Sequence, residues 1–160
     1  MIIKIVAVGR LKERHWQDGA ADYARRLQPY ARLEMVEVPE ARLPERASLA
    51  EEMKAVHREA LAIMERLRQH HGPVIALDRQ GKMLDSMEMA SWLDKQTLEG
   101  RNETAWVIGG PFGLAQSVLD RADLVLSFSK MTFPRQMMRL ILLEQIYRAF
   151  RIIHHEPYHK

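Results

Sequence analysis

The amino-acid sequence predicts an α/β protein with a mostly parallel sheet and helices on both faces. Short apolar segments typical of strands alternate along the chain with segments that carry helix start and stop signals. Two of the helix starts are capping boxes, in which a short polar residue precedes a glutamate by three positions. Strict alternation of strands and helices is typical of parallel sheets. Because the sequence contains no internal repeat or linker, we expect one domain over residues 1–160.

The first half of the chain is expected to supply three strands and two helices. The first and third strands are apolar runs, and the second alternates apolar and polar residues before Pro39. Ser48 and Glu51 form a capping box that opens the second helix, and Gly72-Pro73 ends it. The expected elements are strand 2–8, helix 16–28, strand 32–38, helix 48–70 and strand 74–78.

The second half is expected to supply two strands and three helices. The segment "RQGK" at 79–82 is predicted to be a turn. Asp85 and Glu88 form the second capping box, and Pro134 stands at the first turn of the last helix. The expected elements are helix 85–100, strand 104–110, helix 115–122, strand 124–129 and helix 134–151.

The composition restricts the class of protein. The chain has 160 residues, of which 47% are hydrophobic and 28% are charged, as in globular proteins that are soluble in water. It has no cysteine, which excludes disulfides, thiolate nucleophiles and cysteine-based zinc sites, and fits a reducing compartment. We find no signal peptide and no run of transmembrane length, so we expect a cytoplasmic protein without a membrane partner.

The basic residues are concentrated at the C-terminus. Residues 130–160 contain six Lys or Arg against two Glu, a net charge of +4, whereas the whole chain carries +3. Three histidines lie in the same segment. This distribution fits an anionic partner, first of all a nucleic acid. An ordinary solvated basic helix would give the same pattern.

The last helix is apolar on more than one side. A helix of this kind needs cover on several sides, and the sheet covers only one of them. We therefore expect a homodimer through this helix, with burial inside the monomer as the alternative. Its apolar residues are Met137, Met138, Leu140, Ile141, Leu142, Leu143, Ile146, Tyr147, Ala149, Phe150, Ile152 and Ile153.

Three segments are candidates for the functional site. "IGGPFG" at 108–113 permits close approach of a ligand to the backbone, although a plain tight turn has the same composition. It has neither the Gly-Lys-Ser/Thr of a phosphate-binding loop nor the serine of a hydrolase nucleophile. "SFSKMTFP" at 127–134 could enclose an adenosine, or form an ordinary strand-to-helix loop. Ligands of parallel sheets bind beyond the carboxyl ends of strands, where both segments lie.

The third candidate is the tail "HHEPYHK" at 154–160. It is either a frayed polar end or a tail that contributes catalysis and RNA contacts through Tyr158 and His159. His155 and His159 have a spacing that could suit a metal, but Pro157 breaks the helix that would place them on one face. We therefore expect no metal site.

Four motifs together resemble one known family, which modifies N3 of a pseudouridine in the helix-69 loop of 23S ribosomal RNA. They are the "LD" strand end at 77–78, "IGGPFG" at 108–113, "SKMTFPRQMMRLILLEQIYRAFRI" at 129–152 and the terminal "PYHK". The family consists of small bacterial methyltransferases of the SPOUT superfamily. The likeness extends over essentially the whole chain.

The resemblance implies a C-terminal trefoil knot, a homodimer, S-adenosylmethionine as cofactor and the assembled 70S ribosome as substrate. Gly109 and Gly110 would let the chain pass close to the cofactor and to itself. Arg135 departs from the pattern, because a histidine often follows the proline in the family. By matched position, the implied cofactor-binding residues are Leu77, Gly109, Phe128, Ser129, Lys130, Met131, Thr132 and Phe133.

The chemistry of such a reaction suggests roles for the C-terminal residues. N3 of pseudouridine carries a proton, so the reaction needs a base or cations that stabilise the imide anion. We expect Tyr158, His159 and Arg148 to be catalytic, and Arg135, Arg139 and Lys160 to contact RNA. Two alternative functions are a non-catalytic ribosome-binding or assembly factor and a knotted methyltransferase that acts on tRNA.

Overall fold

The computed structural model describes all of residues 1–160 and confirms the predicted order of ten alternating elements. Five strands, all parallel, form one sheet in the order β2-β1-β4-β3-β5. No helix is both long enough and apolar enough to span a membrane. The strands are β1 (Ile2–Val8), β2 (Arg32–Val38), β3 (Val74–Met83), β4 (Glu103–Ile108) and β5 (Leu124–Ser127). The helices are α1 (Arg14–Leu27), α2 (Leu49–Leu67), α3 (Ser86–Leu98), α4 (Gln116–Arg121) and α5 (Arg135–Ile153).

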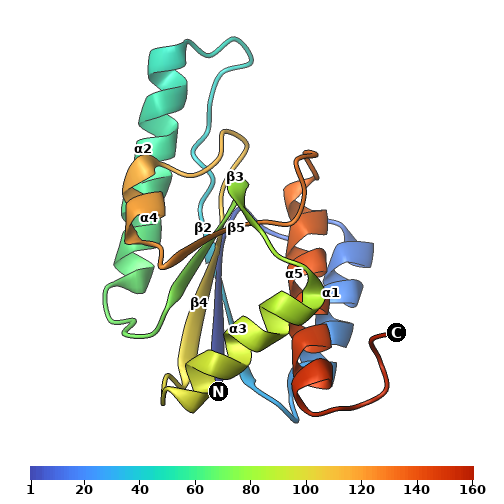
Figure 1. Cartoon of the computed structure of the whole chain (residues 1–160). Helices are drawn as coiled ribbons and strands as arrows, with labels where there is room; N and C mark the ends of the chain where they lie inside the picture. Colours follow the sequence, from blue (N-terminus) through green and yellow to red (C-terminus); the bar gives the residue numbers. More distant parts are fainter.

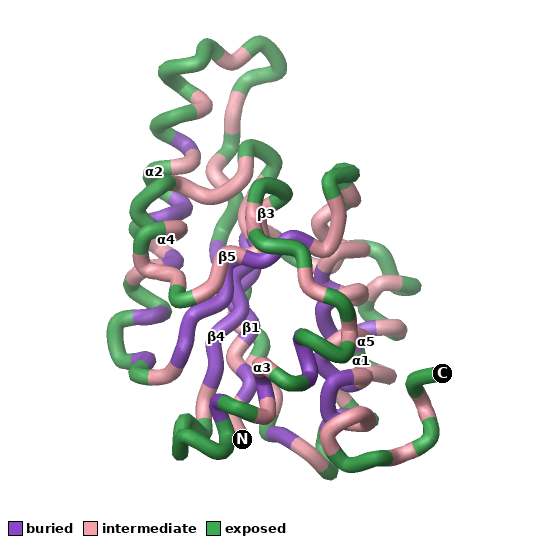
Figure 2. The backbone as a smooth tube through the Cα atoms, in the orientation of Figure 1, coloured by how far each residue is buried: buried purple, intermediate pink, exposed green.

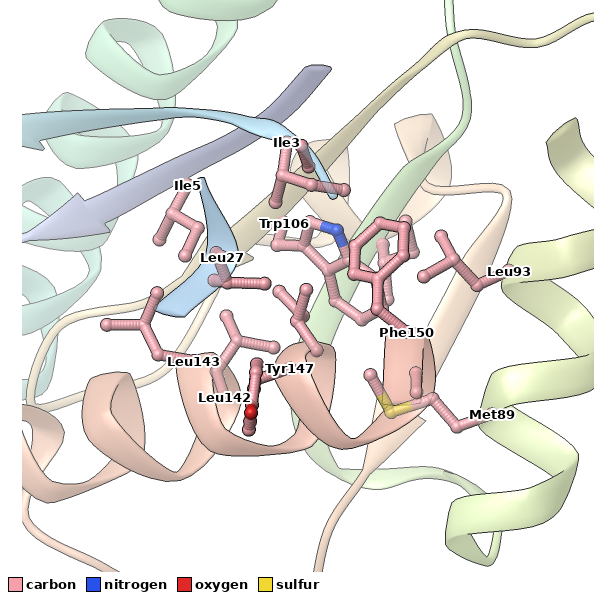
Figure 3. Packing of buried hydrophobic residues seen from close by; sticks show 14 of the residues in the cluster. Ile3, Ile5, Leu27, Met89, Leu93, Trp106, Leu142, Leu143, Tyr147 and Phe150 are labelled. Carbon is pink, nitrogen blue, oxygen red and sulfur yellow. The ribbon is translucent and has the colours of Figure 1, made fainter. Parts of the chain in front are cut away.

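Helices cover both faces of the sheet, as predicted. Helices α2 and α4 lie on one side, and α1, α3 and α5 on the other (Figure 1). Successive residues of a strand point to opposite faces, so each central strand contributes to two cores. Ile5 and Trp106 pack against α1, α3 and α5, whereas Val6 and Val107 pack against α2 and α4. Figure 2 shows the central strands as the most continuously buried part of the chain, and Figure 3 shows the larger core around Trp106.

The predicted turn at 79–82 was wrong, because β3 continues through it to Met83. The strand pairs with β5 up to Leu77, loses register over the next residues and pairs again from Lys82. Gly81 lies where the two strands approach most closely, since a Cβ there would come within 2.7 Å of the Val125 carbonyl carbon. The composition of "RQGK" therefore reflects a bulge at a crowded crossing. The trefoil knot itself stays a prediction.

Helix α5 is covered more fully within one chain than its composition suggested. It packs between α1 and α3 on the sheet, and Leu142, Leu143 and Ile146 are completely buried. Gly19 of α1 permits this packing, because a Cβ there would lie 3.1 Å from the Leu140 side chain. Burial inside the monomer, the alternative to the homodimer, therefore accounts for these residues. The apolar composition of α5 is therefore explained largely by the monomer, and the homodimer needs a separate argument.

One buried histidine makes the stability of the fold depend on pH. His70 lies between α2 and β3, is 4% exposed, and has its Nε2 3.3 Å from the Pro73 carbonyl oxygen. Its Nδ1 has no hydrogen-bond partner and lies 3.7 Å from the Glu103 carboxylate. Burial lowers the pKa of His70 despite these two neighbours, because desolvation disfavours the imidazolium.

We predict that His70→Gln reduces the loss of stability at acidic pH. The pKa of His70 is lowered in the folded state from its ordinary value of 6.5, so the unfolded chain takes up the proton first as the pH falls. Stability from the neutral imidazole is therefore complete above pH 6.5 and declines below it. Urea unfolding of both proteins between pH 7.5 and 5 should show the wild type losing free energy of unfolding relative to His70→Gln. The exposed neighbour His71, changed to Gln, is the control and should leave the wild-type pH profile intact. Parallel profiles for wild type and His70→Gln would contradict the prediction.

Candidate active site

A cavity opens at the carboxyl ends of β3, β4 and β5, where the sheet geometry was expected to place a ligand. Its volume is about 990 Å³. Three segments line it: Leu77–Gln80 at the irregular part of β3, Ile108–Leu114 from the end of β4, and most of Ser127–Phe133 from the end of β5. These loops gather along one edge of the sheet in Figure 1. Residues far apart in sequence therefore form one continuous wall.

The bare backbone of the Gly109–Gly113 loop folds tightly on itself. Gly110 and Gly113 form an isolated bridge, and the Gly113 N–H donates to the Gly110 carbonyl oxygen at 3.1 Å. A Cβ on Gly109 would come within 2.9 Å of the Gly113 carbonyl carbon, and Gly113 has a φ of +80°. The glycines are therefore required both by close packing and by conformation.

A buried glutamate lies behind this loop. A Cβ on Gly110 would come within 2.5 Å of the Glu59 carboxylate, which projects from α2. Glu59 is 6% exposed and accepts a hydrogen bond from the Ala41 N–H at 3.0 Å. Burial raises the pKa of the Glu59 carboxyl. The Gly109–Gly113 loop thus packs against a carboxylate that also binds the backbone of the segment after β2.

The loop between β5 and α5 is held by short side-chain hydrogen bonds. The Ser127 hydroxyl donates to the Ser129 carbonyl oxygen at 3.0 Å, and the Ser129 hydroxyl accepts from the Met131 N–H at 3.0 Å. Arg79 donates to the Thr132 hydroxyl at 3.2 Å, which links the loop to β3. These bonds order a segment that has no regular secondary structure and leave its other backbone groups available to a ligand.

The cavity brings together seven of the eight residues predicted to bind a cofactor. Lys130 is exposed and is absent from the lining. The seven that line the cavity are Leu77, Gly109, Phe128, Ser129, Met131, Thr132 and Phe133. Further lining residues were not among those predicted to bind a cofactor, and they include Asp78, Gln116, Asp120 and Met138. Gln116 and Asp120 are ordinary helix residues in sequence, and only the fold places them at the cavity.

The arginines at the start of α5 are engaged within the protein. Arg135 lines the cavity and forms an ion pair with Glu40 at 2.9 Å. Arg139 is 3% exposed; its guanidinium binds Glu37 at 2.9 Å and donates to the Gly9 carbonyl oxygen at 2.9 Å. The predicted RNA contact of Arg139 does not fit this position, because the charge is buried and already paired. Of the predicted RNA contacts, Lys160 is exposed at the end of the chain.

The three predicted catalytic residues come together beside α5, around a glutamate of this helix that the sequence did not single out. Glu144 Oε1 accepts from Arg148 Nε at 3.0 Å, from Arg148 Nη2 at 2.6 Å and from the Tyr158 hydroxyl at 3.1 Å. The guanidinium carbon of Arg148 lies 4.7 Å from the centre of the Tyr158 ring, and Arg148 Nη1 lies 3.4 Å from His159 Nδ1. The spacing of Glu144 and Arg148, four positions apart on a helix, was the signal that could have revealed this pair.

The environment of Tyr158 keeps its hydroxyl protonated. Burial raises the pKa of Tyr158 well above its ordinary value, and the neighbouring Tyr23 and Glu144 raise it further. Tyr158 therefore serves as a hydrogen-bond donor at neutral pH. His159 is exposed and is the tail histidine that lies beside Arg148.

The cavity and the tail are separate within one chain. No residue from Glu144 to Lys160 belongs to the cavity lining. In Figure 1 the tail turns back beside the far half of α5, away from the loops at the sheet edge. No group of three or more His, Asp or Glu side chains lies close enough together to hold a metal ion.

Comparison with known proteins agrees with this architecture. The chain is 51% identical over 160 residues, the whole of both chains, to a protein of Carboxydothermus hydrogenoformans named "Ribosomal RNA large subunit methyltransferase H". A probable methyltransferase of Bordetella pertussis has a similar fold, with a TM-score of 0.56 at 15% identity over 92% of this chain and 93% of that one. A probable methylase family protein of Haemophilus influenzae has a TM-score of 0.55 at 14% identity over 99% of this chain and 70% of that one.

The family model described as "Predicted SPOUT methyltransferase" matches residues 1–159. This match covers the sheet, the cavity loops and the tail up to His159. The chain belongs to the SPOUT methyltransferase family.

Proposed function

We propose that this chain transfers a methyl group from S-adenosylmethionine to N3 of a pseudouridine in the helix-69 loop of 23S ribosomal RNA, on the assembled 70S ribosome. The observation that carries the proposal is full-length identity of 51% to a protein named as a large-subunit ribosomal RNA methyltransferase. The cavity formed by the predicted cofactor-binding segments supports it. Action on ribosomes would place the reaction in the cytoplasm.

The cavity fits S-adenosylmethionine in size and chemistry. Its volume of about 990 Å³ is large enough for a nucleoside joined to an amino acid. Leu77, Phe128 and Phe133 supply apolar surface for a flat base, and the Gly109–Gly113 loop supplies backbone without side chains in the way. Asp78 and Asp120 add carboxylates that suit ribose hydroxyls and positive charge. When bound, the cofactor supplies an electrophilic methyl group, and the protein has to orient the acceptor and remove its proton.

The tail contains the residues that we propose remove the proton from the acceptor nitrogen. In our proposal His159 accepts it, Tyr158 donates a hydrogen bond that fixes the tail on Glu144, and Arg148 presents positive charge beside His159. Two of the nitrogens of Arg148 are bound to Glu144, which leaves Nη1 as the group directed toward the tail. Proton removal is needed because the imide nitrogen of pseudouridine becomes nucleophilic only as its proton leaves.

We propose a homodimer in which the tail of one subunit completes the cavity of the other. The support is the separation of cavity and tail within one chain, since a single chain does not bring His159 to the cavity. Closed twofold symmetry would create two such composite sites.

The function is tested by methyl transfer to ribosomes. Labelled S-adenosylmethionine is incubated with 70S ribosomes that lack the modification, and in parallel with separate 50S subunits, free 23S RNA and tRNA. We expect label on 70S ribosomes alone, mapped to a pseudouridine of helix 69. Label on tRNA would establish the tRNA methyltransferase instead. Absence of both cofactor binding and label would favour a ribosome-binding factor.

We predict that Gly109→Ala weakens binding of S-adenosylmethionine at least about tenfold, or roughly 1.4 kcal/mol. The added Cβ would displace the Gly113 backbone, which it approaches to 2.9 Å, and so distort the cavity wall. Calorimetric titration measures the affinity. Gly100→Ala is the control, because no atom lies within 4 Å of the added methyl and the residue is remote from the cavity; Gly100 has a positive φ, so this control carries backbone strain without a clash. Equal affinity for both variants would argue against the assignment of this cavity.

We predict that two inactive variants restore activity when their chains are mixed. Gly109→Leu disables the cavity and His159→Ala disables the tail, so each homodimer lacks a complete site. A mixed dimer pairs one intact cavity with one intact tail. After unfolding and refolding of an equal mixture, random pairing should restore about a quarter of the wild-type methylation rate. A mixture as inactive as its components, although dimeric by light scattering, would show that cavity and tail act within one chain.

A further inference from the structure

The chain reverses direction directly after α5. His155 is the one non-glycine residue with a positive φ, 54°, and it follows the last turn of the helix. The Glu156 N–H then donates to the Arg151 carbonyl oxygen at 2.8 Å, which closes the turn. The His155 N–H also donates to the Ile152 carbonyl oxygen at 3.0 Å, so the reversal is a helix C-cap with a histidine at the left-handed position that glycine usually occupies.

Three residues connect the chain beyond this turn to the rest of the fold, and we call them the latch: Tyr30, Arg151 and Glu156. The Tyr30 hydroxyl donates to the Glu156 carboxylate. Arg151 Nη1 lies 2.9 Å from the same carboxylate and 3.3 Å from the Tyr30 oxygen. Each member therefore contacts the other two. The latch connects the tail to the turn between α1 and β2, which lies 126 positions earlier in the chain.

Tyr30 is a rigid anchor for the latch. Its ring stacks on Phe150 with 5.6 Å between ring centres and an angle of 13°, and it also contacts Tyr147 and His154. The pKa of the Tyr30 hydroxyl is raised, first by its hydrogen bond to Glu156, so it remains a donor at neutral pH. The side chain that holds the tail is thus itself held by the aromatic core of α5.

The proposed catalytic residues follow the latch within three positions. Tyr158 packs edge-on against Tyr147 at 4.9 Å between ring centres and donates to Glu144. His159 lies beside Arg148. Because only Pro157 separates Glu156 from Tyr158, the position of the Glu156 carboxylate limits where both can lie along α5.

We propose that Tyr30, Arg151 and Glu156 are positioning residues that hold the tail in one register on α5, so that Tyr158 and His159 are presented to the RNA in a fixed place. This inference rests on the proposed function, in which the tail completes an active site. The latch residues act through the tail and need not touch cofactor or RNA themselves.

The test compares Glu156→Ala, Glu156→Gln and Tyr30→Phe with the wild type. Glu156→Gln keeps an acceptor for Tyr30, and Tyr30→Phe keeps the stacked ring. We expect Glu156→Ala to lower kcat for methylation of 70S ribosomes about tenfold or more, because catalysis is sensitive to small displacements of reacting groups. Affinity for S-adenosylmethionine and thermal stability should stay unchanged, and Glu156→Gln should recover part of the loss.

Two further measurements separate positioning from a general structural effect. Hydrogen exchange of the peptide covering 152–160 should be faster in Glu156→Ala, since the turn loses its support. Tyr30→Phe should lower kcat in the wild-type background but add little to Glu156→Ala, because both changes break the same contact. Glu65→Ala, which breaks the ion pair to Arg68 on α2, is the matched control and should alter neither kcat nor the exchange of the tail.

The outcomes distinguish the two proposals. An active wild type together with a fully active Glu156→Ala would overturn the positioning role, whether or not the tail exchanges faster. Additive losses in Tyr30→Phe and Glu156→Ala would also overturn it. A wild type that binds cofactor but methylates no ribosomal RNA would overturn the proposed function, and the positioning role with it.

Discussion

The arrangement of the C-terminal half depends on one buried cation, Arg139. Its guanidinium reaches from α5 to the carboxyl ends of the first two strands, where it binds Glu37 and the Gly9 carbonyl oxygen. A buried charge of this kind is tolerated only when it is paired and hydrogen-bonded, so this contact strongly restricts where the helix can start. The loop that precedes α5 is thereby held beside the loops after β3 and β4. These loops enclose the cavity.

Ion pairs of the same kind reduce the positive charge that the basic C-terminal segment has available for an RNA. Arg135, Arg139, Arg148 and Arg151 each form an ion pair with a glutamate of the same chain. Two of these partners, Glu37 and Glu40, belong to the N-terminal part of the protein. The net charge of the segment therefore overstates the charge available to an RNA. The arginines mainly hold helix, loop and tail in place, and Lys130 and Lys160 are the exposed cations that remain.

Cavity and tail are both ordered, but by different contacts. The cavity loops are shaped by glycines that exclude a Cβ and by serine and threonine hydroxyls. The tail is held by aromatic packing and by two carboxylates, Glu144 and Glu156. In the proposed dimer, one such part orients the activated methyl group and the other removes the proton of its acceptor.

From its local patterns, the sequence predicts the order of the ten elements, the N-caps of α2 and α3 and most of the cavity wall. These features depend on local composition: apolar runs, Ser48 and Asp85 before their helices, and glycines after a strand. It could not determine the pairing of side chains across the fold. Arg139 and Glu37 are 102 positions apart, and Tyr30 and Glu156 are 126 apart. No local pattern distinguishes Glu59 from the other residues of its helix, and only the fold brings its carboxylate against the Gly110 backbone. Only the tertiary structure decides such contacts, because they depend on which strand ends meet and not on any local pattern.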